Sequence, residues 1–386
     1  MRFRLSKLLI FASMLIFLSS CGSAKEIYNQ AYAVGMGIDY IDDEYNVVIQ
    51  FLDFSNVAKT DQGKSSQSVP VWLAKGKGNT IEAALTDIYQ SVQMRVNFEQ
   101  LNLIVFGEGI IKSKQLEEAF QSLTSNFTVR LTAWAYGTNM SFEDIFTSTV
   151  IFDFPFSYSR LNQPDEGNQQ SSTIPAITLR EFVWRFNEKA MTTIIPSVSL
   201  NEQNILKEDR PKKTAVINGA YILSNKAYKG WLSTSDLRGF IWTNNESNRS
   251  ITTINEEKDN LVTVELIEPK IKLKKNVNGL NYNVIVRLRA IVKQSLDSHL
   301  SQEKFIKKVE DAVKKEVKKT FIAGKEIGAD IFQLEDNLYR YHYHEWKNNK
   351  QEQPIDMANV KVKVETLYSI DKYKSKNSDA NTKRQN

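Results

Sequence analysis

The only thiol in the chain, Cys21, has the most distinctive chemical setting of any residue. Three cations, Arg2, Arg4 and Lys7, come first, and residues 8–18 that follow carry no charge. A basic start followed by an apolar run is typical of a secretory signal. At about 1.5 Å per residue this run is too short to cross a hydrocarbon core of about 30 Å, so the pattern favours a signal that is removed, residues 1–20.

The residues just before the thiol, Leu18-Ser19-Ser20-Cys21, resemble the lipobox of bacterial lipoproteins. In that chemistry the thiol receives a diacylglyceryl group, and cleavage follows between Ser20 and Cys21. Two acyl chains hold a protein stably at a membrane surface. The alternative is a secreted protein whose cysteine lies near an ordinary cleavage site. With Cys21 lipidated, no thiol remains for a disulfide, a thiolate metal site or a cysteine nucleophile.

Two of the three histidines, His342 and His344, are separated by one residue and are followed by Glu345. On a strand such a pair shares one face and chelates a transition metal when a third ligand is present. The spacing implies no third ligand, so surface or interface histidines are the favoured interpretation.

Other catalytic and nucleotide-binding motifs are missing from the sequence. Gly35-Met36-Gly37 lacks the third glycine of a dinucleotide fingerprint, and neither a phosphate loop nor a G-x-S-x-G elbow occurs. Asp39, Asp42 and Asp43 lack the spacing of an EF-hand, which favours a solvated hairpin turn. No carboxylate pair is singled out for glycoside hydrolysis. The sequence therefore predicts a protein that is not an enzyme and has no cofactor.

Composition indicates a globular protein, with 41% hydrophobic and 25% charged residues. The net charge is +5, and removal of the three signal cations leaves about +2. This is too little for a nucleic-acid binder. Lysines recur along residues 307–319, but acidic residues are interspersed, so a solvated helix face is favoured over contact with anionic lipid.

Hydrophobic periodicity predicts an α+β protein of two or three small mixed domains, each a largely antiparallel sheet packed with helices. Residues 21–205 form the N-terminal α/β domain, with a hairpin turning at 42–44, a helix capped at Asn79, a second helix capped at Thr178, and an exposed polar loop at 161–173.

Beyond residue 205 two further parts are expected. Residues 206–258 form a β-rich middle segment that is a candidate for a separate domain. Residues 259–373 form a C-terminal domain, in which a long hairpin, a helix over 306–321 and a return strand at 360–370 make a twisted antiparallel sheet with the helix laid across it. The polar tail 374–386 is expected to be disordered.

Several separated motifs resemble one family, the Ger(x)C family of spore-germination lipoproteins. They begin with Cys21 and the Glu26-Ile27 that follows it, and they continue in the same order along the chain: AVGMGIDY (33–40), VIQFLDF (48–54), PVWLAKGKGNTIEAAL (70–85), LNLIVFGEGI (101–110), KGWLSTSDLRGFIW (229–242) and GADIFQLEDNLYRYHYHEWKN (328–348).

Two local departures from the family pattern stand out. The family usually continues Cys-Trp-Asp after lipidation, whereas this chain has Cys21-Gly22-Ser23-Ala24. The glycines often found after the position of Asp330 are replaced here, where Gln333 and Glu335 flank Leu334.

The resemblance implies the noncatalytic C subunit of a nutrient germinant receptor. Such a subunit is held by lipid on the outer leaflet of the spore inner membrane beside two polytopic subunits, A and B. An alternative from a different class is a solute-binding lipoprotein that captures a small nutrient. A wall-acting hydrolase is the least favoured interpretation, because no catalytic group can be named.

Residues within the family motifs are the candidates for interaction surfaces. They are Trp231, Arg238, Gly239, Trp242, Asp330, Phe332, Tyr341 and Trp346. The structural alternative, which the residue types favour, is that the tryptophans pack a core and that Gly239 relieves a turn or bulge.

Overall fold

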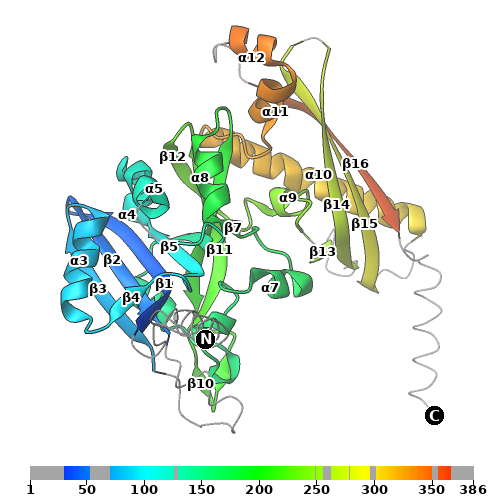
Figure 1. The fold of residues 1–386 in the computed structure, drawn as a ribbon. Coiled ribbons are helices and arrows are strands. Elements are labelled where there is room, and N and C mark those ends of the chain that lie inside the picture. Colours follow the sequence, from blue (N-terminus) through cyan, green and yellow to red (C-terminus); the bar gives the residue numbers. More distant parts are fainter. Residues whose placement is uncertain are drawn as a thin grey trace, which may run out of the picture.

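The computed structural model describes residues 30–52, 70–125, 129–247, 249–254, 262–277, 279–295, 301–349 and 355–366. The predicted signal 1–20, Cys21 and the tail 374–386 lie outside the described residues. Two sheets organise the α+β fold, one in each lobe of Figure 1. No helix in the described ranges combines the length and the apolar character needed to cross a membrane.

The first sheet has ten strands and occupies the N-terminal lobe. Its main path runs β12-β11-β8-β6-β5-β1-β2-β3, with β4 beside β1 and β7 beside β6. The centre is parallel, from β1 through β5 and β6 to β8, whereas the outer ladders are antiparallel. The strands are β1 (Gln30–Ile41), β2 (Glu44–Phe51), β3 (Trp72–Gly78), β4 (Arg95–Asn97), β5 (Leu103–Gly107), β6 (Trp134–Thr138), β7 (Ile177–Thr178), β8 (Thr192–Asn201), β11 (Thr214–Ser224) and β12 (Ala227–Ser233).

The first hairpin shows why β1 and β2 pair. Asp42 and Asp43 both have positive φ, 55° and 62°. Two successive residues of that kind make a tight turn whose twist matches the flanking strands, and aspartate tolerates this conformation. The aspartates therefore form the predicted turn.

Helices cover both faces of this sheet. On one face the core includes buried side chains of α3 (Ile81–Ser91), α5 (Gln115–Ser125) and α8 (Leu179–Asn187). On the other face lie α6 (Phe142–Phe146) and the short 3₁₀ turns η3 (Ile151–Asp153) and η4 (Phe156–Tyr158). Thr178 caps α8 as predicted, but the cap of α3 is Thr80, whose side chain accepts from the Ala83 amide, rather than Asn79.

Asp39 positions α4 (Glu108–Lys112) through hydrogen bonds to backbone amides. Its Oδ1 accepts hydrogen bonds from the Tyr40 and Ile110 amides, each at 2.8 Å. Burial raises the pKa of this carboxyl. Gly107 leaves the space that the carboxylate fills, because a Cβ there would lie 2.1 Å from Asp39 Cγ.

The middle segment 206–258 divides between the two sheets. Its strands β11 and β12 complete the first sheet, and β13 (Arg249–Ile254) begins the second. Between them lies the short helix α9 (Arg238–Ile241). The polar passage before β11 forms the small hairpin β9 (Leu206–Lys207) and β10 (Arg210–Pro211), and the polar loop 161–173 contains α7 (Pro164–Gln170).

The second sheet has the order β13-β14-β15-β16, with β14 (Val262–Lys275), β15 (Asn281–Ser295) and β16 (Asp356–Thr366). β14 and β15 form the predicted hairpin. The predicted antiparallel return strand is wrong, because β16 runs parallel to β15. The chain first passes through α10 (Gln302–Glu326), α11 (Leu334–Tyr341) and α12 (Tyr343–Asn349), and such a crossover brings a strand back in the same direction.

One hydrophobic core joins the two sheets. Ile194 of β8, Ala220 and Ile222 of β11 and Leu232 of β12 belong to the same buried cluster as α10 and the covered face of the second sheet. α10 lies across that sheet in Figure 1. Because β11 has its other face in the first core, through Tyr221 and Leu223, this strand serves both lobes.

Candidate functional site

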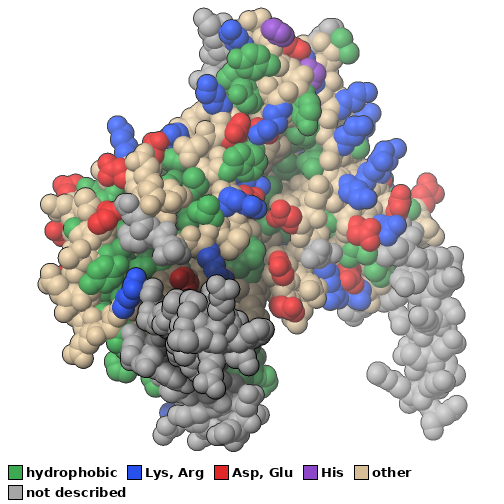
Figure 2. Space-filling view, in the orientation of Figure 1, with side chains coloured by type: hydrophobic (Ala, Val, Ile, Leu, Met, Phe, Trp, Pro, Cys, Tyr) green, Lys and Arg blue, Asp and Glu red, His purple; other side chains and the backbone are tan. Residues whose placement is uncertain are grey.

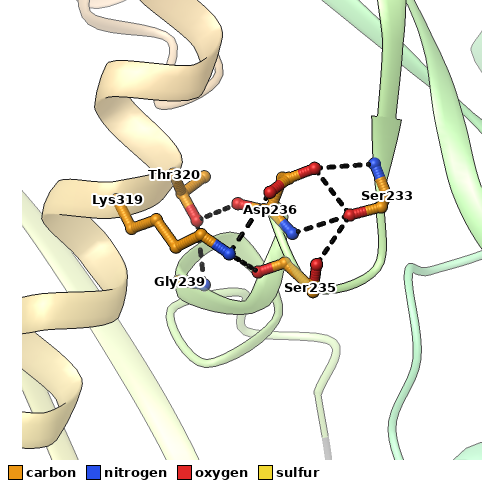
Figure 3. A network of polar contacts seen from close by, with 6 residues as sticks. All are labelled: Ser233, Ser235, Asp236, Gly239, Lys319 and Thr320. Carbon is orange, nitrogen blue, oxygen red and sulfur yellow. Dashed lines mark hydrogen bonds and ion pairs between the residues drawn. The ribbon is translucent and has the colours of Figure 1, made fainter.

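The segment 233–243 contacts α10 through the hydroxyl group of Thr320, which both accepts and donates a hydrogen bond (Figure 3). Thr320 Oγ1 accepts from the Gly239 amide at 3.0 Å and donates to the Asp236 carbonyl at 2.5 Å. Thr320 is completely buried. This hydroxyl thus satisfies two backbone groups at the start of α9 and fixes α9 on the long helix.

An ion pair at the edge of the same contact adds a second link. Lys319 Nζ lies 3.2 Å from Asp236 Oδ1 and donates to the Ser235 carbonyl at 3.1 Å. Asp236 Oδ2 accepts from Ser233 Oγ at 2.6 Å. The hydrogen bond from Ser233 and the neighbouring Lys319 ammonium lower the pKa of the Asp236 carboxyl.

Gly239 lies at the closest approach of α9 to α10. A Cβ at this position would lie 2.4 Å from the Glu316 carbonyl oxygen and 2.6 Å from Val317 Cα, both backbone atoms. Trp242 is buried in the shared core. In contrast, Arg238 is exposed, and Trp231 is partly exposed with its indole stacked over Gly219.

Asp330 organises the start of α11 from within the protein. Its Oδ2 accepts from the Glu335 amide at 2.7 Å, whereas its buried Oδ1 has no hydrogen-bond partner among the residues that the structure describes. Burial raises the pKa of this carboxyl to about 7. Phe332 is buried in the shared core.

Gln333 connects this motif to the N-terminal lobe. Its side-chain amide accepts from the Thr192 amide at 3.0 Å and donates to the Thr192 carbonyl at 2.7 Å. Thr192 is the first residue of β8. Gln333 has φ 57°, in the left-handed region that favours glycine. A glycine, which the family pattern has near this position, would adopt this φ without strain. It would have no side chain to form hydrogen bonds with Thr192.

An aromatic cluster covers α11 and α12. The Trp346 ring lies 4.7 Å from Tyr339 and 5.8 Å from Tyr343, and its Nε1 donates to Glu335 Oε1 at 3.2 Å. Tyr341 is 73% exposed. His342 ends α11 and His344 lies in α12, so the pair is not on a strand. Within the described ranges no group of three potential metal ligands occurs.

The uncovered face of the second sheet carries a row of like charges. Lys270, Arg287 and Lys363 are direct neighbours across β14, β15 and β16, and all three are exposed. Lys272 and Lys361 flank the same face. Figure 2 shows lysine and arginine side chains gathered over this lobe. We call Lys270, Arg287 and Lys363 the cationic row.

A cavity of about 640 Å³ opens between α7, α8 and the loop before β13. Its lining includes the indoles of Trp134 and Trp184 and the carboxylates of Asp165, Glu181 and Glu246. Burial, with the neighbouring Glu181, raises the pKa of the Glu246 carboxyl. The lining is therefore aromatic and mainly acidic, with Arg180 as a cation beside the three carboxylates.

The eight candidate residues fall into two places. Trp231, Arg238, Gly239 and Trp242 lie on β12 and at α9, and Asp330, Phe332, Tyr341 and Trp346 lie from the end of α10 to α12. Sequence reasoning missed Thr320 and the role of Gln333. Thr320 bonds to Gly239, 81 residues away, and Gln333 bonds to Thr192, 141 residues away. No local pattern carries that information.

Comparisons with known proteins identify the family over nearly the whole chain. Residues 23–200 match the family model described as spore germination protein N-terminal domain, and residues 218–372 match spore germination B3/GerAC like, C-terminal. Spore germination protein KC of Bacillus subtilis is 24% identical over 91% of this chain and 92% of its own length. Spore germination protein A3 of the same species is 24% identical over 55% of this chain and 53% of its own.

Among solved structures, the crystal structure of the GerBC protein aligns with 86% of this chain and 97% of its own, at a TM-score of 0.49 and 14% identity. The two family models together leave only residues 1–22, 201–217 and 373–386 unmatched. The chain therefore belongs to the Ger(x)C family of spore germination proteins.

Proposed function

We propose that this protein is the lipid-anchored, noncatalytic C subunit of a spore nutrient germinant receptor. The observation that carries the proposal is the match to both family regions in their expected order, 23–200 and 218–372. The relative of matching length is a spore germination protein. Its partners would be the polytopic A and B subunits, and its place the outer leaflet of the spore inner membrane, held through lipid on Cys21.

The accessible candidates are the proposed contact residues for those partners. Trp231, Arg238 and Tyr341 expose their side chains, and Trp346 is partly exposed. The other candidates, Gly239, Trp242, Asp330 and Phe332, would act by holding these surfaces in place. Gly239 packs against α10, Trp242 and Phe332 lie in the shared core, and Asp330 holds the start of α11.

The test is nutrient-triggered germination of spores whose only copy of the protein carries Cys21→Ala. We expect loss of the response and release of the protein from the membrane fraction, measured by immunoblot together with the A and B subunits. Ser23→Ala is the matched control, because it alters the same segment and keeps the thiol. Retention of the response with the protein released would contradict the proposal.

Arg238→Ala tests one contact residue separately. Its side chain is exposed, so the variant should fold, and a weaker nutrient response with unchanged protein level would support a contact role. Arg95→Ala, another exposed arginine, on β4, is the control. An unchanged response would remove Arg238 from the proposed surface.

A second candidate function is capture of a small solute, and the cavity of about 640 Å³ favours it. Indoles and carboxylates together suit an ammonium group. Saturable binding of an amino acid in calorimetry, abolished by Trp184→Ala, would support this function. Absence of heat at millimolar ligand would remove it.

A further inference from the structure

Residues 151–158 form a loop with several large side chains exposed, and we call it the aromatic loop. Phe152 is 78% exposed, and Ile151, Phe154 and Tyr158 are 52%, 44% and 55% exposed. The rings form a continuous series, with centroids 6.1 Å apart from Phe152 to Phe154 and 5.4 Å from Phe154 to Tyr158. Contiguous exposed apolar surface of this kind marks a binding surface.

The base of the loop is fixed firmly to the N-terminal lobe. Phe156 is buried against Phe146, with ring centroids 6.1 Å apart. Asn162 Nδ2 donates to the Phe156 carbonyl at 3.0 Å, and Lys207 Nζ lies 2.6 Å from Asp153 Oδ2. The exposed rings therefore sit on an anchored base.

The backbone at the tip is strained. Phe152 has φ 62° and Asp153 has φ 55°, a conformation that bulky residues rarely adopt. Such strain persists only where surrounding contacts enforce it, and it clusters at functional sites. Here it turns the Phe152 ring outward.

The aromatic loop lies at the end of the lobe where the chain leaves toward Cys21. Phe154, Pro155 and Tyr158 line grooves together with Val34 of β1 and Leu52 at the end of β2. β1 starts at Gln30, nine residues after Cys21. Those nine residues span at most about 30 Å, so a lipid on Cys21 places the membrane within reach of this end.

The β9–β10 hairpin places charges of both signs beside the loop, and Lys207 is already paired with Asp153 of the loop. Figure 1 shows β10 at the lower end of the N-terminal lobe. Lys207, Arg210 and Lys212 lie in or beside the hairpin, with Glu208 and Asp209 at its turn, and Leu206 is exposed. The surroundings of the loop are thus close to neutral, and its exposed rings are the feature that matches the aromatic belt at a membrane interface.

We propose that the aromatic loop inserts into the headgroup region of the membrane beside the lipid anchor and sets the orientation of the protein on the bilayer. The direction of approach rests on the proposed tether at Cys21. The loop contact itself does not, because it would form in the unlipidated protein as well. An anchor at one residue leaves the orientation of the protein free, and a second contact with the bilayer removes that freedom.

The single cysteine makes a specific probe available. In the mature chain with Cys21→Ser, Phe152→Cys gives one thiol for an environment-sensitive fluorophore, and Ile322→Cys on α10, also an exposed apolar position, gives the matched control. With vesicles of phosphatidylglycerol and phosphatidylethanolamine we expect a blue shift and protection from aqueous quencher at position 152 and neither at 322.

Serine substitutions test the rings themselves. Phe154→Ser with Tyr158→Ser, read out by the label at 152, should weaken vesicle partitioning about a hundredfold, because each of the two inserted rings contributes on the order of a tenfold factor. Both side chains are exposed, and thermal unfolding checks that the fold is intact.

An unchanged spectrum at position 152 with vesicles would overturn the inference. Loss of co-purification of the A or B subunit on Phe152→Ser, without vesicle binding, would identify a protein contact instead and overturn it too. Neither outcome touches the proposed function, which the Cys21→Ala spores test independently.

Discussion

Asp330 is a carboxyl group whose ionisation works against folding. Its pKa is about 7 in the folded protein, against an ordinary value near 4, because burial disfavours the charged form. Between about pH 4 and pH 7 the unfolded chain gives up this proton while the folded chain keeps it. The free energy of unfolding therefore falls as pH rises through that window, and the loss is complete above about pH 7.

Asp330→Asn should remove that dependence. The amide keeps an acceptor for the Glu335 amide but does not ionise, so the variant gains stability relative to the native chain between pH 4 and pH 8, by a few kcal/mol at about 1.4 kcal/mol per pKa unit. Urea unfolding at both pH values measures it. Parallel pH profiles for the two proteins would contradict the assignment.

Gln333 exchanges backbone strain for two hydrogen bonds to Thr192. Gln333→Ala keeps the strained φ and loses both bonds, and we expect about 1–3 kcal/mol of destabilisation. Gln333→Gly loses the same bonds but relieves the strain, so it should be about 1 kcal/mol more stable than the alanine variant. Equal stability of the two variants in urea unfolding would show that the strain is negligible.

The limits of sequence analysis are clear at this scale. The N-cap role of Thr178 can be predicted from the local sequence, because its side chain accepts from the amide of Glu181, only three residues further along. Asn79 and Thr80 are both residue types that cap helices. The local sequence therefore does not decide which of them stands at the start of α3, and in the structure it is Thr80. The bonds from Gln333 to Thr192 span two lobes, and no local rule anticipates them.

At the scale of elements, the cationic row weakens its own sheet. Like charges directly opposite one another on neighbouring strands are destabilising by roughly 0.2–1 kcal/mol per pair, and Arg287 faces Lys270 on one side and Lys363 on the other.

Arg287→Thr should therefore stabilise the isolated protein, by about 0.5–2 kcal/mol for two pairs at low salt. The gain should shrink as salt screens the charges. Lys77→Thr on β3 is the control, because Lys77 lies opposite the neutral Asn46. Destabilisation by Arg287→Thr, or a gain that salt leaves unchanged, would contradict the argument.

The direction of β16 shows why element pairing is harder to predict than element type. The alternation in residues 360–370 predicts a strand, and β16 covers Asp356–Thr366. Whether that strand returns parallel or antiparallel depends on how many helices the connection contains, and α11 and α12 turn the chain before it re-enters the sheet. Single-strand patterns carry no such information.

For the whole molecule, the shared core predicts that the two lobes unfold together. Ile222 has its side chain in the core that joins β11 to α10 and the second sheet. Ile222→Ala should cost about 2–5 kcal/mol and lower the Tm of both lobes equally. Differential scanning calorimetry should show one transition before and after the change. Two transitions, only one of them shifted, would contradict a common core.

The same core explains why sequence alone does not assign residues 206–258 to one domain. Short strands separated by turns look alike whether they form their own sheet or extend another, and β11 and β12 extend the first. Their apolar residues face two ways, Ala220 and Ile222 toward one core and Tyr221 toward the other, as in a strand buried on both faces.

The position of β16 at the end of the chain bears on how the protein is made. The face of β11 that carries Ile222 stays uncovered until α10 and the second sheet close over it, and that sheet is complete only with Thr366. At about 5–20 residues per second, roughly ten to thirty seconds of synthesis separate the two. A nascent chain of this protein therefore exposes an apolar sheet face during that interval, and a stop codon after α12 would leave the edge of β15 without its partner strand.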